Sequence, residues 1–311
     1  MIILVFLVIF KVLFLIFPGV VLAAAREGLL LWLHNIIPAL LPFMIIVNML
    51  IGMGFARFLG KMLAPAMQKI FGLPGAGGFA LITGLTSGYP IGAKTVADLR
   101  KNGEISVRDA QHLLAFCNNA GPLFILGVVG VGFFGSTAAG YVLWAGHVLS
   151  ALILGVLLKF SCSGGRGQSP LHHILPTFSY NSNISPGKAL SHSVKNAMES
   201  MTIIGGLVIF FSAVMAVLGE IGLPDKGLAA GLIAGAVEVT GGVHKISEYG
   251  ISTVSLGFAA FVIAFGGLSI HMQTFHFTEG TGVKTAPYLA CKILHGILAA
   301  TITIFLTIAF V

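Results

Sequence analysis

The sequence predicts an all-α, polytopic membrane protein with about 7 transmembrane helices and two opposed re-entrant helical hairpins in an inverted repeat. Three observations predict this class. The 311 residues are 57% hydrophobic and only 9% charged, with a mean hydropathy of +1.00, whereas soluble domains carry roughly 25% charged residues. Long apolar runs recur along the whole chain. The 41 glycines and 12 prolines are typical of broken or closely packed membrane helices.

The charge pattern favours the lipid bilayer over nucleic acid as the partner of this chain. The formal net charge is +7, from 17 basic and 10 acidic side chains. The basic residues cluster between apolar runs, as they do in the cytoplasmic loops of membrane proteins. Three cysteines, Cys117, Cys162 and Cys291, form no CxxC motif and no even set, so neither a disulfide framework nor a cysteine metal site is expected.

The first predicted element is an N-terminal transmembrane helix over residues 1–28. Residues 2–24 form an apolar run with a single charge, Lys11. The alanine-rich end of this run resembles a signal-peptide cleavage site. A retained helix is favoured because no basic segment precedes the apolar core. The N-terminus is then cytoplasmic.

The first repeat is predicted over residues 29–160, and two helices open it. A crossing over 29–52 is expected to be interrupted by Pro38 and Pro42. Residues 53–76 place basic side chains on one helix face with apolar residues between them. This pattern is typical of an amphipathic helix at the membrane interface.

The rest of this repeat is broken by glycine, proline and polar residues. Residues 77–98 are too short to cross, and two half-helices around residues 86–90 predict a re-entrant hairpin that is buried in protein. Residues 110–133 predict a broken helix, with Ser106 as the N-cap of its first half. A continuous crossing over 137–160 completes the repeat.

A polar connector separates the two repeats. It covers residues 161–198, is rich in Ser, Gly, Pro, Asn and His, and is expected in the cytoplasm. The second repeat, over 199–311, has its elements in the same order as the first. They are a crossing over 200–221, a hairpin over 227–247, a broken helix over 251–275 and a final crossing over 287–311. The polar stretch 269–274 is expected to form the break of the second broken helix.

The distribution of Lys and Arg supports this layout. With residues 53–76 on the inside, eleven Lys and Arg residues of the loops and helix ends fall inside and three fall outside, a strong positive-inside bias. The count holds only if residues 77–98 enter and leave the membrane on the same side. It therefore supports the hairpin independently of its glycine content.

Short matches relate the two repeats at a nearly constant offset. The offsets are 150, 151 and 149 residues for the pairs Leu73-Pro74 with Leu223-Pro224, Gly84 with Gly235, and Ala115-Phe116 with Ala264-Phe265. Three crossings, an odd number, separate the two predicted hairpins. The hairpins are therefore expected to enter from opposite faces, which is the plan of secondary transporters with a midplane site.

Polar side chains at the tips and breaks are the candidate binding residues. The candidates for substrate binding are Thr86, Ser87, Tyr89, Lys94, Asn118, Asn119, Ser269, His271 and Gln273. Their hydroxyls, amides and cations, with the N–H groups of half-helices, suit a small polar or anionic solute. Glu238 and Thr240 at the second tip are the candidates for coupling to Na⁺ or H⁺, because Glu238 is the only acid predicted near the midplane.

Each candidate has a structural alternative. The tip hydroxyls can satisfy a helix break, and Lys94 can extend to the cytoplasmic interface. The two asparagines can join neighbouring helices. Glu238 can pair with Lys245 or His244.

No catalytic residue, cofactor or metal site is predicted. The sequence has no nucleophile elbow and no phosphate-binding loop, so neither an intramembrane enzyme nor an ATP-driven pump is expected from this chain alone. His244, His271 and His276 match no standard spacing of metal ligands.

Two motifs carry a resemblance to a known family. The run from Gly84 to Lys94 (GLTSGYPIGAK), followed by Leu114 to Pro122 (LAFCNNAGP), resembles the YlbJ-type sporulation integral membrane proteins, which carry the nucleoside-recognition ("Gate") domain. The resemblance covers most of the chain. The family is similar in plan to concentrative nucleoside transporters, which also use two opposed re-entrant hairpins and two broken helices.

The resemblance implies a function in endospore formation. It implies transport of dipicolinic acid, a small planar dianion, across the outer forespore membrane. Nucleoside transport is an alternative, but the first hairpin tip has no acidic residue to hold a ribose. A non-transporting scaffold or sensor for assembly of the spore cortex is another. The partners considered are a second copy of the chain or other sporulation membrane proteins.

Overall fold

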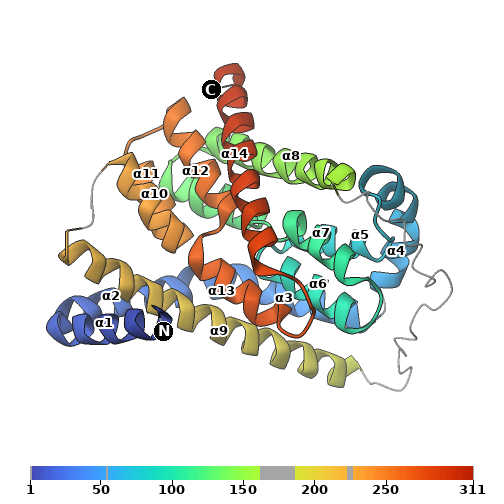
Figure 1. The fold of residues 1–311 in the computed structure, drawn as a ribbon, viewed down its shortest axis with the longest axis horizontal. Helices are drawn as coiled ribbons and strands as arrows, with labels where there is room; N and C mark the ends of the chain where they lie inside the picture. The colour runs from blue at the N-terminus through green and yellow to red at the C-terminus, as the bar shows by residue number, and fades with distance from the viewer. Residues whose placement is uncertain (1, 54, 162–185, 223–226, 311) are drawn as a thin grey trace.

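The computed structural model describes residues 2–53, 55–161, 186–222 and 227–310, which form a helical protein without a strand in these ranges (Figure 1). Within these ranges, four helices are long and apolar enough to cross a membrane, or five if one bent pair counts as a single span. Shorter apolar helices, such as Gly77–Thr86 and Leu228–Val237, accompany them. The chain is a polytopic helical membrane protein, as the composition predicts. The count of about 7 crossings stays a prediction.

The N-terminal region is bent where the sequence predicts one helix over residues 1–28. Helices α1 (Ile2–Ile16) and α2 (Pro18–Leu31) meet at an angle of 102°. The proline explains the bend, because the residue before a proline is disfavoured in helical conformation. Phe17 is indeed non-helical, with φ −115° and ψ 52°.

Proline does not interrupt the next crossing, contrary to the sequence-based expectation. Helix α2 continues through the π-type turn η1 (Trp32–Ile36) into α3 (Ile37–Gly52). Pro38 has no N–H to donate to the preceding turn, and the helix accommodates it because the π-type turn directly before it is wider than an α-helical turn. Pro42 also lies within the continuous helix α3.

The rest of the first half follows the predicted order. Its elements are α4 (Phe55–Ala66), η2 (Met67–Phe71), α5 (Gly77–Thr86), α6 (Ile91–Lys101), α7 (Val107–Cys117), η3 (Leu123–Phe133) and α8 (Thr137–Ser161). The predicted N-cap at Ser106 is confirmed. The Asp109 N–H donates to Ser106 Oγ over 3.1 Å, and the Ser106 N–H donates to Asp109 Oδ2 over 3.0 Å.

The second half repeats the order of helix, hairpin, broken helix and helix, with no counterpart of α4 and η2 among its described residues. Its elements are α9 (Pro186–Glu220), α10 (Leu228–Val237), α11 (Val239–Ser247), α12 (Thr253–Phe265), α13 (Gly267–Thr278) and α14 (Thr285–Phe310). Helix α9 begins at Pro186, so the C-terminal part of the predicted connector 161–198 is helical. Residues 162–185 of that connector lie outside the described residues.

The break of the second broken helix differs from the predicted one. It lies at Gly266 (φ +93°) and Gly267 (φ +69°), not at residues 269–274, which belong to helix α13. Only glycine adopts two successive positive φ values at little cost. The backbone therefore turns at the glycines, and the polar side chains remain on a helix.

The two hairpins lie on opposite sides of α14, with α10–α11 on one side and α5–α6 on the other (Figure 1). Helix α14 packs against α12 and α8, while α9 packs against α2 and α3. The rings of His147 on α8 and His295 on α14 lie 5.0 Å apart. They are separated by 148 residues, close to the offset between the repeats. The membrane face from which each hairpin enters stays a prediction.

Candidate functional site

The first hairpin packs directly on the break of the first broken helix. A Cβ atom added at Gly84 on α5 or at Gly92 on α6 would overlap the carbonyl oxygen of Cys117, at the end of α7. Only glycine allows three helix backbones to meet this closely. In the turn between α5 and α6, the Tyr89 N–H donates to the carbonyl oxygen of Asn119 over 2.5 Å. The first tip is therefore held by the broken helix.

The second hairpin tip is built around Glu238. Its carboxylate oxygens accept the N–H groups of Thr240, over 2.9 Å, and Gly241, over 2.7 Å. Glu238 is thus the N-cap of helix α11, where the helix dipole favours a negative charge. His244 lies instead 3.9 Å from Glu248, so the alternative pairing of Glu238 with this histidine does not occur.

A pocket lies where the two tips and the two broken helices meet. Six polar side chains line it, from the two tips and from the second broken helix: Ser87, Tyr89, Glu238, Thr240, Ser269 and Gln273. Its apolar walls come from the helix α2–α3, from α9 and from η3, for example Ile36, Val208 and Phe124. Glu238 is the one acid, and no Lys, Arg or His is found among the described residues that line this pocket.

Buried polar atoms of this pocket lack protein partners. Within the described ranges, Ser87 Oγ, Tyr89 Oη and both amide atoms of the Gln273 side chain make no hydrogen bond to protein. Burying such groups without a partner is costly. Because these groups come from both halves of the chain, a polar solute in the pocket can bond to both halves at once.

The two asparagines lie behind this pocket, fully buried. Asn118 Nδ2 donates to Thr274 Oγ1 over 2.9 Å and to Tyr288 Oη over 3.0 Å. It therefore joins α7 to α13 and α14. Asn119 Nδ2 donates to the carbonyl oxygen of Phe116 over 2.7 Å. Both side chains hold the helix break in shape and make no direct contribution to the pocket wall.

A buried lysine that the sequence-based interpretation missed also bonds to the first helix break, beside Asn118 and Asn119. Lys292 on α14 is 1% exposed. Its Nζ donates to the carbonyl oxygen of Asn118 over 2.9 Å and lies 3.1 Å from His295 Nδ1. His271, one of the predicted residues, contacts Tyr288 through Nδ1 over 3.3 Å. A lone charge within an apolar helix of 26 residues was the signal that could have found Lys292.

No three His, Cys, Asp or Glu side chains come together as metal ligands in the part of the chain that the structure describes.

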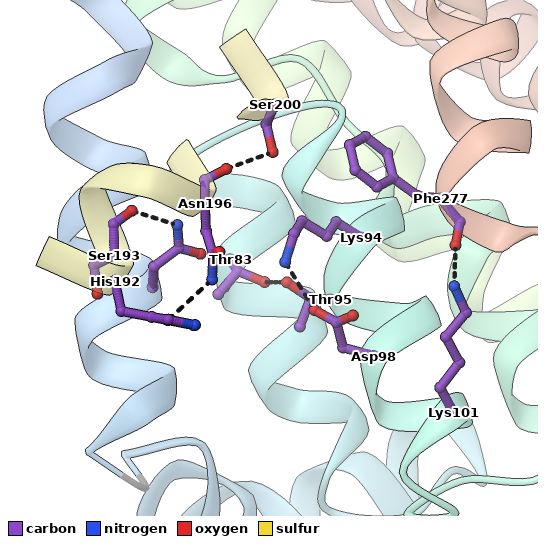
Figure 2. Close-up of polar contacts among 11 residues, drawn as sticks. Thr83, Lys94, Thr95, Asp98, Lys101, His192, Ser193, Asn196, Ser200 and Phe277 are labelled. Carbon is purple, nitrogen blue, oxygen red and sulfur yellow. Dashed lines mark hydrogen bonds and ion pairs between the residues drawn. The ribbon is translucent and has the colours of Figure 1, made fainter. Parts of the chain in front are cut away.

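Two predicted residues point away from the pocket. Thr86 is exposed, and its hydroxyl donates to the carbonyl oxygen of Ile82 over 2.8 Å. Lys94 pairs with Asp98, one turn along α6, over 3.0 Å. Figure 2 shows this pair beside the bond between Thr83 and Thr95.

Replacing Lys94 with methionine is therefore expected to have a small effect. The side chains of Lys94 and Asp98 are 23% and 41% exposed, and such ion pairs contribute about 0.5 kcal/mol or less to stability. The melting temperature in detergent and the uptake of solute by proteoliposomes should both stay close to those of the wild type. A folded Lys94→Met protein without uptake would place Lys94 in the binding site after all.

Comparisons with known proteins agree with this architecture. The sequence model for the nucleoside recognition family, Gate, matches residues 33–137, which include the first hairpin and the first break. The chain is 32% identical over 320 aligned residues to the "Sporulation integral membrane protein YlbJ" of Bacillus subtilis strain 168, and the alignment covers 93% of this chain and 78% of that protein. No solved structure matches the chain. The identity and coverage show that the chain belongs to the YlbJ family of sporulation integral membrane proteins.

Proposed function

We propose that this membrane protein is a secondary transporter that moves a small polar solute by alternating access. The solute binds between the two hairpin tips, and no covalent chemistry takes place. The observation that carries the proposal is the pocket itself. Both tips and both broken helices line it, and they bring buried, unpartnered groups of Ser87, Tyr89 and Gln273 to one space.

The pocket suits a flat solute with polar groups at its edge. Hydroxyl and amide groups of Ser87, Tyr89 and Gln273 can bond to carboxylates or to a ring nitrogen, while Ile36 and Phe124 can cover the faces of the ring. Dipicolinate, the solute that the family resemblance implies, has this shape and these groups. Glu238 repels an anion, so we propose that dipicolinate moves together with a compensating cation or proton.

The cellular location that we propose rests on the relative in Bacillus subtilis. The relative named above is a sporulation protein, so we place this chain in the outer forespore membrane, with a cytoplasmic N-terminus. A second copy of the chain or other sporulation membrane proteins are the proposed partners.

Uptake of labelled dipicolinate into proteoliposomes tests the proposal, and Gln273 provides the sharpest variant. Replacing Gln273 with leucine removes both polar groups at similar volume. The loss of a buried hydrogen bond to the solute is expected to lower uptake roughly tenfold. The control is Met272→Leu, because the neighbouring Met272 is 45% exposed and does not line the pocket.

Two outcomes contradict the proposal in different ways. Equal uptake by the Gln273→Leu and Met272→Leu proteins would mean that the solute binds elsewhere. No uptake and no binding of dipicolinate by folded wild-type protein would favour the scaffold or another solute, with nucleosides as the next candidates to add to the assay.

A further inference from the structure

We propose that the ammonium group of Lys292 is a tethered cation that occupies the place of a coupling sodium ion, so that this transporter works without Na⁺. The inference rests on the proposed transport function and specifies its coupling. Unwound backbone and C-terminal ends of half-helices are where membrane transporters bind Na⁺, because their carbonyl oxygens point into the break. Here a lysine from the same chain lies at such an end.

Three main-chain carbonyl oxygens at this break are paired with donors from the protein, whereas the buried side-chain oxygens Asn118 Oδ1 and Asn119 Oδ1 accept no hydrogen bond from the described residues. Helix α7 ends at Cys117, and its C-terminal end carries partial negative charge. The carbonyl oxygen of Phe116 accepts the Asn119 side chain, that of Asn118 accepts Lys292 Nζ, and that of Asn119 accepts the Tyr89 N–H. The ammonium is the only full charge among these three donors. It supplies the positive charge that a bound metal cation would otherwise supply.

No carboxylate among the groups described around Lys292 pairs with its ammonium in place of the Asn118 carbonyl oxygen. His295 on its own helix lies 3.1 Å from Nζ, and Cys291 precedes it in the chain. From the neighbouring helices come His147 of α8, whose ring lies 5.0 Å from that of His295, and His271 of α13 through Tyr288. Helix α12, which packs along α14, has no titratable side chain. None of these groups is a carboxylate, so the ammonium is held by the partial negative charge of the Asn118 carbonyl oxygen, with His295 Nδ1 beside it.

The first test uses wild-type protein and needs no transported solute. The full chain is purified in detergent, and its melting temperature is measured in NaCl and in choline chloride at equal concentration. We expect the same melting temperature in both salts. A sodium site filled at about 100 times its Kd would raise the melting temperature by several degrees. A rise in NaCl would overturn the proposal, even if dipicolinate uptake is demonstrated.

The second test removes the tethered cation. Lys292→Ala is expected to melt at a lower temperature than the wild type in choline chloride and to regain part of the loss in NaCl, because Na⁺ can then enter the break. Lys284→Ala is the matched control, since Lys284 is exposed directly before α14. A folded Lys292→Ala protein that ignores Na⁺ would overturn the proposal. If this variant does not fold, the wild-type measurement decides.

Uptake separates this proposal from the transport function. Wild-type proteoliposomes are expected to take up dipicolinate equally well when choline replaces Na⁺. Absence of uptake in both salts refutes transport of dipicolinate, whereas uptake that requires Na⁺ refutes only the tethered cation.

Discussion

Replacing Gly84 with alanine is expected to prevent the first hairpin from packing and to abolish the folded protein. The added methyl group would overlap the carbonyl oxygen of Cys117. Overpacking in a core typically costs roughly 1–3 kcal/mol, and the cost here exceeds that range, because a main-chain oxygen cannot rotate away as a side chain can. The measurement is the yield of monodisperse protein after extraction from membranes.

Gly206 on helix α9 provides the control for this prediction. No atom outside its own helix lies within 4 Å of a Cβ added there, and Gly206 is exposed. Gly206→Ala should therefore give at least the wild-type yield, since alanine favours a helix by about 1 kcal/mol over glycine. Equal yields of the Gly84→Ala and Gly206→Ala proteins would show that α5 and α7 do not pack closely.

Replacing Glu238 with alanine is expected to abolish uptake and to loosen the second hairpin tip. The change removes the acceptor of two N–H groups at the start of α11, and loss of an N-cap costs about 0.5–2 kcal/mol. It also removes the one acid of the pocket. Glu238→Gln keeps the size and one acceptor oxygen. We expect this variant to fold and to lose uptake roughly tenfold or more, because it loses a hydrogen bond to a charged group.

An exposed glutamate on the same helix provides the control for a general loss of negative charge. Glu248, at the other end of α11, is 58% exposed and lies 3.9 Å from His244. Glu248→Gln should retain both the melting temperature and the uptake of the wild type. If Glu238→Gln and Glu248→Gln behave alike, the carboxylate at the tip has no function in transport.

The sequence predicts the hairpins, the broken helices and the cap at Ser106, because glycine, proline and N-cap residues act locally. Of the candidate residues that the sequence singles out, Ser87, Glu238 and Gln273 line one pocket. Thr86 and Lys94 do not line this pocket, because the turn between α5 and α6 sets the direction in which each half-helix presents its side chains. The lone charge in α14 marks Lys292 in the sequence, but its partner cannot be predicted, because that partner is a backbone oxygen 174 residues away and a main-chain acceptor leaves no mark in the sequence.

The two helix breaks also differ in how easily they can bend. The first is fastened by an ammonium, a side-chain amide and a main-chain N–H, whereas the second turns at Gly266 and Gly267. A helix break at two glycines bends at little cost, whereas a helix break held by buried hydrogen bonds resists bending. The second break is therefore expected to bend more easily than the first.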